Sequence, residues 1–205
     1  MKQDFKFPLY VILHPFDGFW DMKYENRGRL RVAAVILFLL VLAMILQKQY
    51  AGFLVNYNDF RRLNSLSELV FVLAPLLLWC IANWSVTTLM GGEGKFRDIL
   101  MATSYALVPL VLIYPPMTLF SRFMVQEETV FYYLLNTAAV FWFIGLLFVG
   151  IMTVHQYSPS KTILTIFLSV VVMGIIVFLG TLIFSMLQQI AEFVINVYRE
   201  IIFRA

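Results

Sequence analysis

The amino-acid sequence predicts an all-α membrane protein with about five transmembrane helices and an amphipathic segment at each end. Two observations predict this fold class. Hydrophobic residues make up 61% of the 205 residues and charged residues only 13%. In a soluble domain roughly a quarter of all residues are charged. The hydrophobic residues also gather in long apolar runs, with most charges between them. The length suits one membrane domain, and no stretch indicates a second, soluble domain.

Residues 1–31 are expected to form a charged arm on the cytoplasmic membrane surface. The apolar stretch 9–13 is too short for a cleavable signal peptide, so the first span is expected to serve as a retained anchor. Pro15 suits the first turn of a short helix. After it, aromatic and acidic residues occupy different helix faces, as is typical of an interfacial helix that contacts lipid or a partner. The aromatic face holds Phe16, Phe19, Trp20 and Tyr24.

Residues 32–186 are expected to form the membrane domain. The first span is expected over 32–46, or on to Tyr50, with Lys48 reaching the far interface. A mixed loop leads to the second span at 69–90, which contains Pro75. Cys80 and Asn83 in this second span are expected to take part in helix packing.

The glycine-rich loop 91–98 is the clearest turn signal in the chain. Because glycine accepts positive φ without steric cost, we expect Gly92 or Gly94 to adopt it and close a tight turn. A phosphate-binding loop is the alternative. The P-loop pattern fails, however, because Leu89 stands at its first glycine and Phe96 at its Ser/Thr position.

The third span is expected to begin near Ile99 and to contain Pro109, and Pro115-Pro116 is expected to end or break it. Residues 117–128 then form a short external segment.

The fourth span is expected over 130–154. A tight loop over 155–161 follows, because Ser158-Pro159 favours a turn, and the fifth span starts near Thr162.

The C-terminal residues 187–205 are expected to form a separate amphipathic helix. The chain carries no charge from Thr162 to Ala191, which is too long for one perpendicular span. From residue 187 one helix face is apolar and the other polar. We expect this helix to bend onto the membrane surface or to dock on a partner. Its apolar face holds Leu187, Ile190, Ala191, Val194, Tyr198 and Ile202.

The orientation follows from the basic residues near span ends, which favour the cytoplasmic side. A cytoplasmic N-terminus and an external C-terminus give the better distribution. The cytoplasmic side then holds Lys2, Lys6, Lys23, Arg27, Arg29, Arg31, Lys95, Arg97 and Lys161. The external side holds Lys48, Arg61, Arg62, Arg122, Arg199 and Arg204. Because the positive charges cluster at membrane edges, lipid headgroups are a better match than nucleic acid.

The sequence offers little catalytic chemistry. The one cysteine excludes an intramolecular disulfide, and no Cys/His set has metal-ligand spacing, so no metal or cofactor is expected. No ionisable residue is securely placed in mid-membrane, which disfavours an ion-coupled transporter and an intramembrane enzyme. A Ser104–His155 pair is conceivable, but a serine within a span more often bonds back to a carbonyl. We therefore expect a protein that is not an enzyme.

Specific residues resemble the Yip family of Ypt/Rab-interacting proteins, and its short-armed bacterial branch in particular. The resemblance covers residues 14 to about 185. It rests on His14-Pro15 with Phe19, on Gly91-Gly92-x-Gly94-x-Phe96-x-Asp98, on Tyr105-x-x-x-Pro109, and on the hinge that starts at His155.

The resemblance implies a five-span fold with a cytoplasmic N-terminus in a bacterial cell membrane. Eukaryotic relatives bind small GTPases through longer N-terminal segments, which this sequence lacks, so GTPase binding is not expected. Some bacterial relatives look like companions of transport systems, including carbohydrate uptake. The leading hypothesis is a non-enzymatic accessory or scaffold subunit of a larger membrane assembly. The alternative is a small transporter or channel-like protein, in which Pro75, Pro109 and Pro115 would mark broken helices around a path.

Overall fold

The computed structural model describes residues 6–56 and 64–204. Lys2, Arg61 and Arg62, on which the orientation argument partly rests, lie outside these residues. Within the described part, five helical segments are long and apolar enough to cross a membrane. They are Leu30–Tyr50, Ser65–Leu89, Phe96–Phe120, Gln126–His155 and Pro159–Glu200. The predicted all-α fold class with five spans is therefore confirmed.

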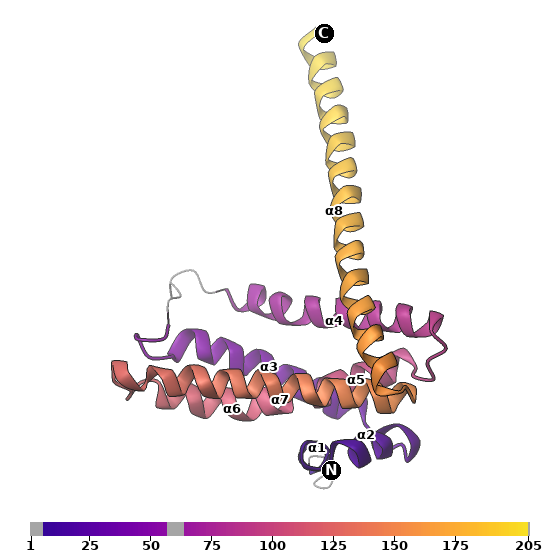
Figure 1. Ribbon diagram of the computed structural model, residues 1–205. Coiled ribbons are helices and arrows are strands. Elements are labelled where there is room, and N and C mark those ends of the chain that lie inside the picture. The colour runs from indigo at the N-terminus through magenta and orange to yellow at the C-terminus, as the bar shows by residue number, and fades with distance from the viewer. Residues whose placement is uncertain (1–5, 57–63, 205) are drawn as a thin grey trace.

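Helices α3 (Leu30–Tyr50), α4 (Ser65–Leu89) and α7 (Thr129–His155) form a bundle together with the third span. The short helices α1 (Phe7–Leu13) and α2 (Pro15–Tyr24) lie at one end of this bundle (Figure 1). The third span packs against both α3 and α7, whereas α4 lies to one side of that layer. This arrangement places the third span at the centre of the domain.

The third span consists of two helices, α5 (Phe96–Ala106) and α6 (Val108–Phe120), which meet at Leu107. The break follows from Pro109, whose missing N–H and bulky ring are incompatible with a helical bond to the carbonyl of Tyr105. All residues from 101 to 110 are buried. The irregular backbone at the break is thus enclosed by protein, as backbone at membrane depth has to be.

The prediction that Pro115-Pro116 ends or breaks the third span is wrong. Both prolines lie inside α6, which continues to Phe120. Consequently the segment between α6 and α7 begins at Ser121 rather than at residue 117, and it includes the short 3-10 helix η2 (Gln126–Glu128). The physical reason is that α6 packs between α3 and α7, and such packing supports a helix through a proline within a membrane.

The last helix, α8 (Pro159–Arg204), is one continuous helix of 46 residues. The predicted bend near Leu187 is absent. Sharp kinks need proline, Gly/Ser pairs or an inserted side chain, and the segment 181–190 contains neither glycine nor proline. Figure 1 shows α8 crossing α4 near its base and then leaving the bundle.

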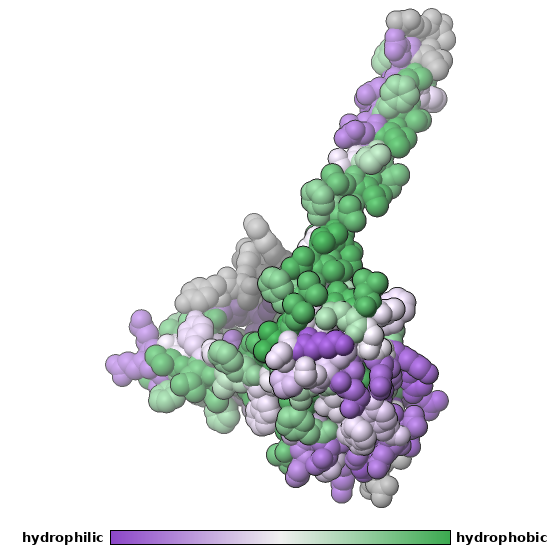
Figure 2. All heavy atoms as spheres, turned by 45° about the vertical axis from the view of Figure 1, so that its right-hand side comes forward, coloured by the Kyte–Doolittle hydropathy of each residue, from purple (hydrophilic) through white to green (hydrophobic). Residues whose placement is uncertain are grey.

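Only the first part of α8 is covered by the rest of the protein. Thr162, Thr165 and Ser169 are buried, and the Ser169 hydroxyl accepts a hydrogen bond from the Asn83 side-chain amide of α4 at 3.1 Å. Asn83 and Cys80 are both buried, so their predicted place in helix packing is confirmed. From residue 177 onward, in the part of α8 called the stem here, every described side chain is exposed. On the face seen in Figure 2, the lower part of this stem is apolar and hydrophilic residues appear farther along it.

The end of the bundle opposite the arm is held by polar contacts. The Lys48 ammonium donates to both carboxylate oxygens of Glu68 at 2.7 and 2.8 Å, linking α3 to α4. The Gly52 N–H donates to the hydroxyl of Ser121 at 2.8 Å. The Arg122 guanidinium donates to the carbonyl of Tyr50 at 3.1 Å. The two loops at this end are therefore tied to each other.

Candidate functional site

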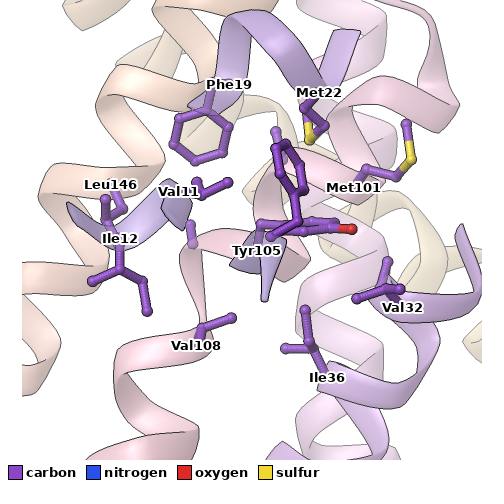
Figure 3. Packing of buried hydrophobic residues seen from close by; sticks show 14 of the residues in the cluster. Val11, Ile12, Phe19, Met22, Val32, Ile36, Met101, Tyr105, Val108 and Leu146 are labelled. Atoms are coloured by element: carbon purple, nitrogen blue, oxygen red, sulfur yellow. The ribbon is translucent and has the colours of Figure 1, made fainter. Parts of the chain in front are cut away.

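The N-terminal arm does not lie free on a surface but packs against α5 and α7. Val11 of α1 and Phe19 of α2 are completely buried. Figure 3 shows both side chains gathered with Tyr105 of the third span and Leu146 of α7. The ring of Phe7 meets the edge of the Tyr105 ring, with centroids 5.8 Å apart. The arm is thus part of the core of the domain.

Two glycines permit this close packing. A Cβ on Gly18 would lie 2.7 Å from the Cα of Val11, so only glycine lets α1 and α2 approach each other here. A Cβ on Gly150 of α7 would lie 3.1 Å from the ring of Phe19. The sequence analysis missed Val11 and the role of Gly18. The available signal was a glycine beside Phe19 in an otherwise bulky helix.

The predicted aromatic face of α2 is divided between two surroundings. Phe19 points into the core, whereas Phe16, Trp20 and Tyr24 are 57%, 47% and 38% exposed. The expectation of one common aromatic face is therefore wrong. The reason is that the inward face of α2 is formed by Gly18, Phe19 and Met22, and of the four aromatic residues only Phe19 belongs to it. These exposed residues remain available to lipid or a partner.

His14 and Pro15 form the joint between α1 and α2. Pro15 is the first residue of α2, as predicted. The His14 side chain is exposed, and its ring stacks on Tyr10 with centroids 5.1 Å apart. This surface position, away from other titratable ligands, suits a joint more than a metal site. Among the described residues, no group of three His, Cys, Asp or Glu side chains could hold a metal ion.

The glycine loop ends α4 with a left-handed residue at a different glycine from the one expected. Positive φ falls on Gly91, at 69°, and on neither Gly92 nor Gly94, so that prediction is wrong. Gly91 follows the last residues of α4, where a left-handed residue lets the Gly92 N–H reach back to the Thr87 carbonyl, at 2.8 Å. This is the usual glycine-terminated helix end.

Gly92 and Gly94 are needed for a different reason, the close approach of His155. A Cβ on Gly92 would overlap Nδ1 of His155, and one on Gly94 would lie 2.7 Å from its Cε1. The Gly94 N–H donates to Nδ1 of His155 at 3.3 Å. His155 is 1% exposed, and its Nε2 is buried without a hydrogen-bond partner among the described residues. The loop between α4 and α5 is therefore seated on the end of α7.

Charged and aromatic side chains surround this contact between the glycine loop and His155. The Lys23 ammonium of α2 donates to the Val154 carbonyl at 2.7 Å and lies 3.6 Å from the Glu93 carboxylate. Lys161 of α8 donates to the Met90 carbonyl at 2.8 Å and lies over the ring of Tyr157. One end of the domain thus joins the arm, the glycine loop and the turn between α7 and α8.

Tyr157 holds the turn itself. Its ring stacks on His155 with centroids 5.4 Å apart, and its hydroxyl donates to the Thr87 carbonyl at 3.3 Å. Burial raises the pKa of Tyr157 above its ordinary value of 10.0, so the hydroxyl stays a neutral donor. Gln156 adopts a left-handed conformation with φ of 55°, which lets α7 end and α8 begin within the three residues 156–158. The predicted loop 155–161 is correspondingly shorter.

The other predicted site residues lie on the third span. Asp98 accepts a bond from the Lys95 N–H at 3.0 Å and so caps α5. The Phe96 ring meets Trp84 of α4 edge to face, with centroids 6.2 Å apart. Tyr105 and Pro109 are buried on either side of the helix break. The Ser104 hydroxyl bonds back to the Leu100 carbonyl at 2.7 Å, the arrangement that the sequence analysis favoured over a pairing with His155.

The C-terminal contact residues are not part of this cluster. Ile190, Val194 and Tyr198 are 58%, 58% and 64% exposed on α8, which leaves the bundle before it reaches them (Figure 1). The predicted site residues therefore form a connected group around the arm, the glycine loop and His155, and a second group on the stem of α8.

The family model of the Yip1 domain matches residues 9–181. The chain belongs to the Yip1 domain family. No curated protein and no solved structure matches it. The match begins inside α1, so the Yip1 domain of this protein includes the docked arm as well as the spans. The match ends on α8 at residue 181, so Ile190, Val194 and Tyr198 lie beyond it.

Proposed function

We propose that this Yip1-domain protein is a non-enzymatic accessory or scaffold subunit of a larger membrane assembly. The observation that carries the proposal is the uncovered stem of α8. The helix is apolar around its circumference up to about residue 187 and then two-faced, and every side chain described beyond residue 177 is exposed. Apolar surface gains free energy when it is removed from water, at about 25 cal/mol per Å². A partner subunit would supply that cover for the part outside the lipid.

The length of α8 favours a partner beyond the bilayer. Its 46 residues span roughly 69 Å at ~1.5 Å per residue, more than twice the ~30 Å of a hydrocarbon core. The part that follows the uncharged run carries Glu192, Arg199 and Glu200 on one face, and the apolar residues Ile190, Val194 and Tyr198 share another. An amphipathic helix of this kind binds in a groove of another protein or at a lipid surface.

We further propose a bacterial cell membrane as the location, with the arm in the cytoplasm and a transport system, such as one for carbohydrate uptake, as the partner class. The resemblance to bacterial relatives supports the partner class. The clustering of Lys23 and Lys161 at one end of the domain supports the orientation, because basic residues favour the cytoplasmic side.

The test is truncation after Gln189, followed by purification in mild detergent. The five spans should remain inserted, and the co-purifying partner should be lost. A matched pair of full-length variants separates surface chemistry from length. Changing Ile190, Val194 and Tyr198 to serine should abolish co-purification, whereas changing Glu192, Asn196 and Arg199 on the other face should not.

Retention of all partners by the truncated protein would contradict the scaffold proposal and leave α8 as a lipid anchor. A photocrosslinking residue at Val194 provides a second readout, because it reacts with whatever covers the stripe. Crosslinks to lipid alone would lead to the same conclusion.

A small transporter or channel-like protein is the second candidate. The break at Leu107, inside a fully buried stretch, supports it, because interrupted helices line the binding sites of many transporters. Pro75 and Pro115 do not break their helices. Solute flux into vesicles that contain only the purified protein would favour this candidate. Flux that depends on the co-purified partner would favour the scaffold.

A further inference from the structure

A cavity of about 410 Å³ lies inside the bundle, between α4 on one side and α3, the third span and α7 on the other. This volume falls within the range of ligand pockets, roughly 300–1,000 Å³. Helix α4 contributes most of one wall, and the break at Leu107 contributes to the opposite wall. The lining residues used below are Phe71, Val72, Pro75, Trp79, Thr103 and Tyr114.

The walls select an apolar ligand. Among the lining residues only Trp79, Thr103 and Tyr114 carry polar side-chain atoms, and the rest are aliphatic, aromatic, methionine or proline. A sugar bound here would leave most of its hydroxyl groups without hydrogen-bond partners, which is costly for buried polar groups. If the protein is a transporter of carbohydrate, its solute therefore does not bind in this cavity.

The cavity opens toward the surroundings of α4. Phe71 and Pro75 line it and also line a groove of about 760 Å³ on α4 that runs through Val70 to Leu66. Phe71 is 72% exposed, so it stands at the rim shared by groove and cavity. The residues at this rim belong to the second span, and hydrocarbon is the phase that meets them there.

We propose that this cavity binds one acyl chain of a membrane glycerolipid, which enters along α4 past Phe71 and Pro75. The packing of the walls excludes a helix as the occupant. Helix α4 contacts both α3 and α5 directly, so a helix about 10–12 Å across with its side chains cannot lie between them. The uncovered α8 of a second copy therefore cannot lie in it, whereas an extended hydrocarbon chain can.

Among the described residues, the mouth of the path carries one compensated pair of charges. Leu66 and Ser67 lie at the end of α4 where Lys48 bonds to both oxygens of Glu68. The two charges compensate each other, so this pair adds little affinity for an anionic headgroup over a zwitterionic one. The described residues therefore hold the lipid by its acyl chain.

The cavity contains its own reporter, the indole of Trp79. A variant with Trp20, Trp84 and Trp142 changed to phenylalanine emits only from Trp79. It is reconstituted in vesicles of phosphatidylcholine with brominated acyl chains, which quench an indole in contact with them. Trp142, which is 47% exposed on α7, serves as the lipid-facing reference in a matching single-tryptophan variant. Quenching of Trp79 to at least the extent of Trp142 is expected.

The variant Val72→Phe fills the cavity from α4 and should remove most of the Trp79 quenching while the quenching of Trp142 is unchanged. Leu77→Phe is the matched control, because Leu77 is on the same helix, is 45% exposed and lines neither the cavity nor the groove. Unquenched Trp79 would overturn the proposal, as would quenching that Val72→Phe leaves intact, because the lipid would then only surround the bundle. If Val72→Phe does not fold, Leu110→Phe fills the cavity from α6 instead. It should likewise remove most of the Trp79 quenching, and quenching that it leaves intact would overturn the proposal.

Discussion

The backbone N–H of Gly94 donates a hydrogen bond to Nδ1 of His155, a residue 61 positions later in the chain. This contact joins the turn between α4 and α5 to the last residue of α7. The glycines of the loop are thus explained less by flexible backbone than by the volume of an imidazole ring. The following predictions begin from this contact.

Gly94→Ala should destabilise the protein, because its Cβ would lie 2.6 Å from Val154 and 2.7 Å from His155. Overpacking of this kind costs about 1–3 kcal/mol, seen as a lower Tm in detergent. Gly145→Ala is the control, since nothing lies within 4 Å of its Cβ position. Equal Tm values for the two variants would show that the loop does not rest on His155.

The conformational and steric roles of the loop glycines can be separated. Gly91 has φ of 69° and nothing within 4 Å of its Cβ position. Gly91→Asn should therefore be tolerated better than Gly91→Val, because asparagine accepts the left-handed region and β-branched residues do not. At Gly92 the asparagine and valine variants should be destabilised alike, since any side chain there meets His155. Thermal unfolding of the four variants is the measurement.

Phe19→Ala should release the arm from the bundle. Phe19 is completely buried, and truncating a buried phenylalanine costs about 3–5 kcal/mol. Limited proteolysis should then cut within α1 and α2 while the spans stay protected. Phe16→Ala, at a residue that is 57% exposed, should leave the cleavage pattern unchanged. Cleavage of both variants at the same rate would mean that the arm does not dock.

The hydrogen bond between Asn83 and Ser169, which joins α4 to α8, should show energetic coupling. A double-mutant cycle with Asn83→Ala and Ser169→Ala is expected to give roughly 0.6 kcal/mol and at most about 1.7 kcal/mol, the range for such bonds in membranes. The measurement is unfolding in a mixed detergent. A coupling energy of zero would indicate that α8 does not cross α4 at this point.

Topology can be tested by labelling single cysteines with a membrane-impermeant reagent. The background is Cys80→Ala, because the native thiol is buried. Phe53→Cys, at a residue that is 85% exposed, should react from outside the cell. Lys95→Cys should react only after permeabilisation. Reaction of both positions from the same side would contradict the five-span arrangement.

The spans could be predicted from sequence because hydropathy is a local property. The uncharged runs predict all five. The break at Leu107 was expected only under the transporter alternative, since the main prediction placed Pro109 within the third span and the break at Pro115-Pro116. The prolines at 115 and 116 were misjudged because packing against α3 and α7 supports the helix, and packing is not visible in a local pattern. The absence of a bend in α8 has a local cause, the lack of glycine or proline between residues 181 and 190.

The candidate site was predicted only in part. The residues of the glycine loop and His155 were named separately, and their contact across 61 positions was not anticipated. Lys23 and Tyr157 were not singled out, because a lysine beside a helix end and a tyrosine in a turn are ordinary in sequence. The burial of Val11 was missed because α1 is too short to show periodicity.

The packing of the arm against the third span and α7 also determines when the arm can fold during synthesis. Val11 and Phe19 leave the ribosome well before the residues that cover them. Tyr105 belongs to the third span, and Leu146 and Gly150 lie in the second half of α7, which α8 follows. At 5–20 residues per second the arm waits on the order of ten seconds for its binding surface. During that interval its apolar side chains are open to chaperones, to the membrane surface and to newly made chains nearby. The arm can therefore close only on a protein whose third and fourth spans have already been inserted.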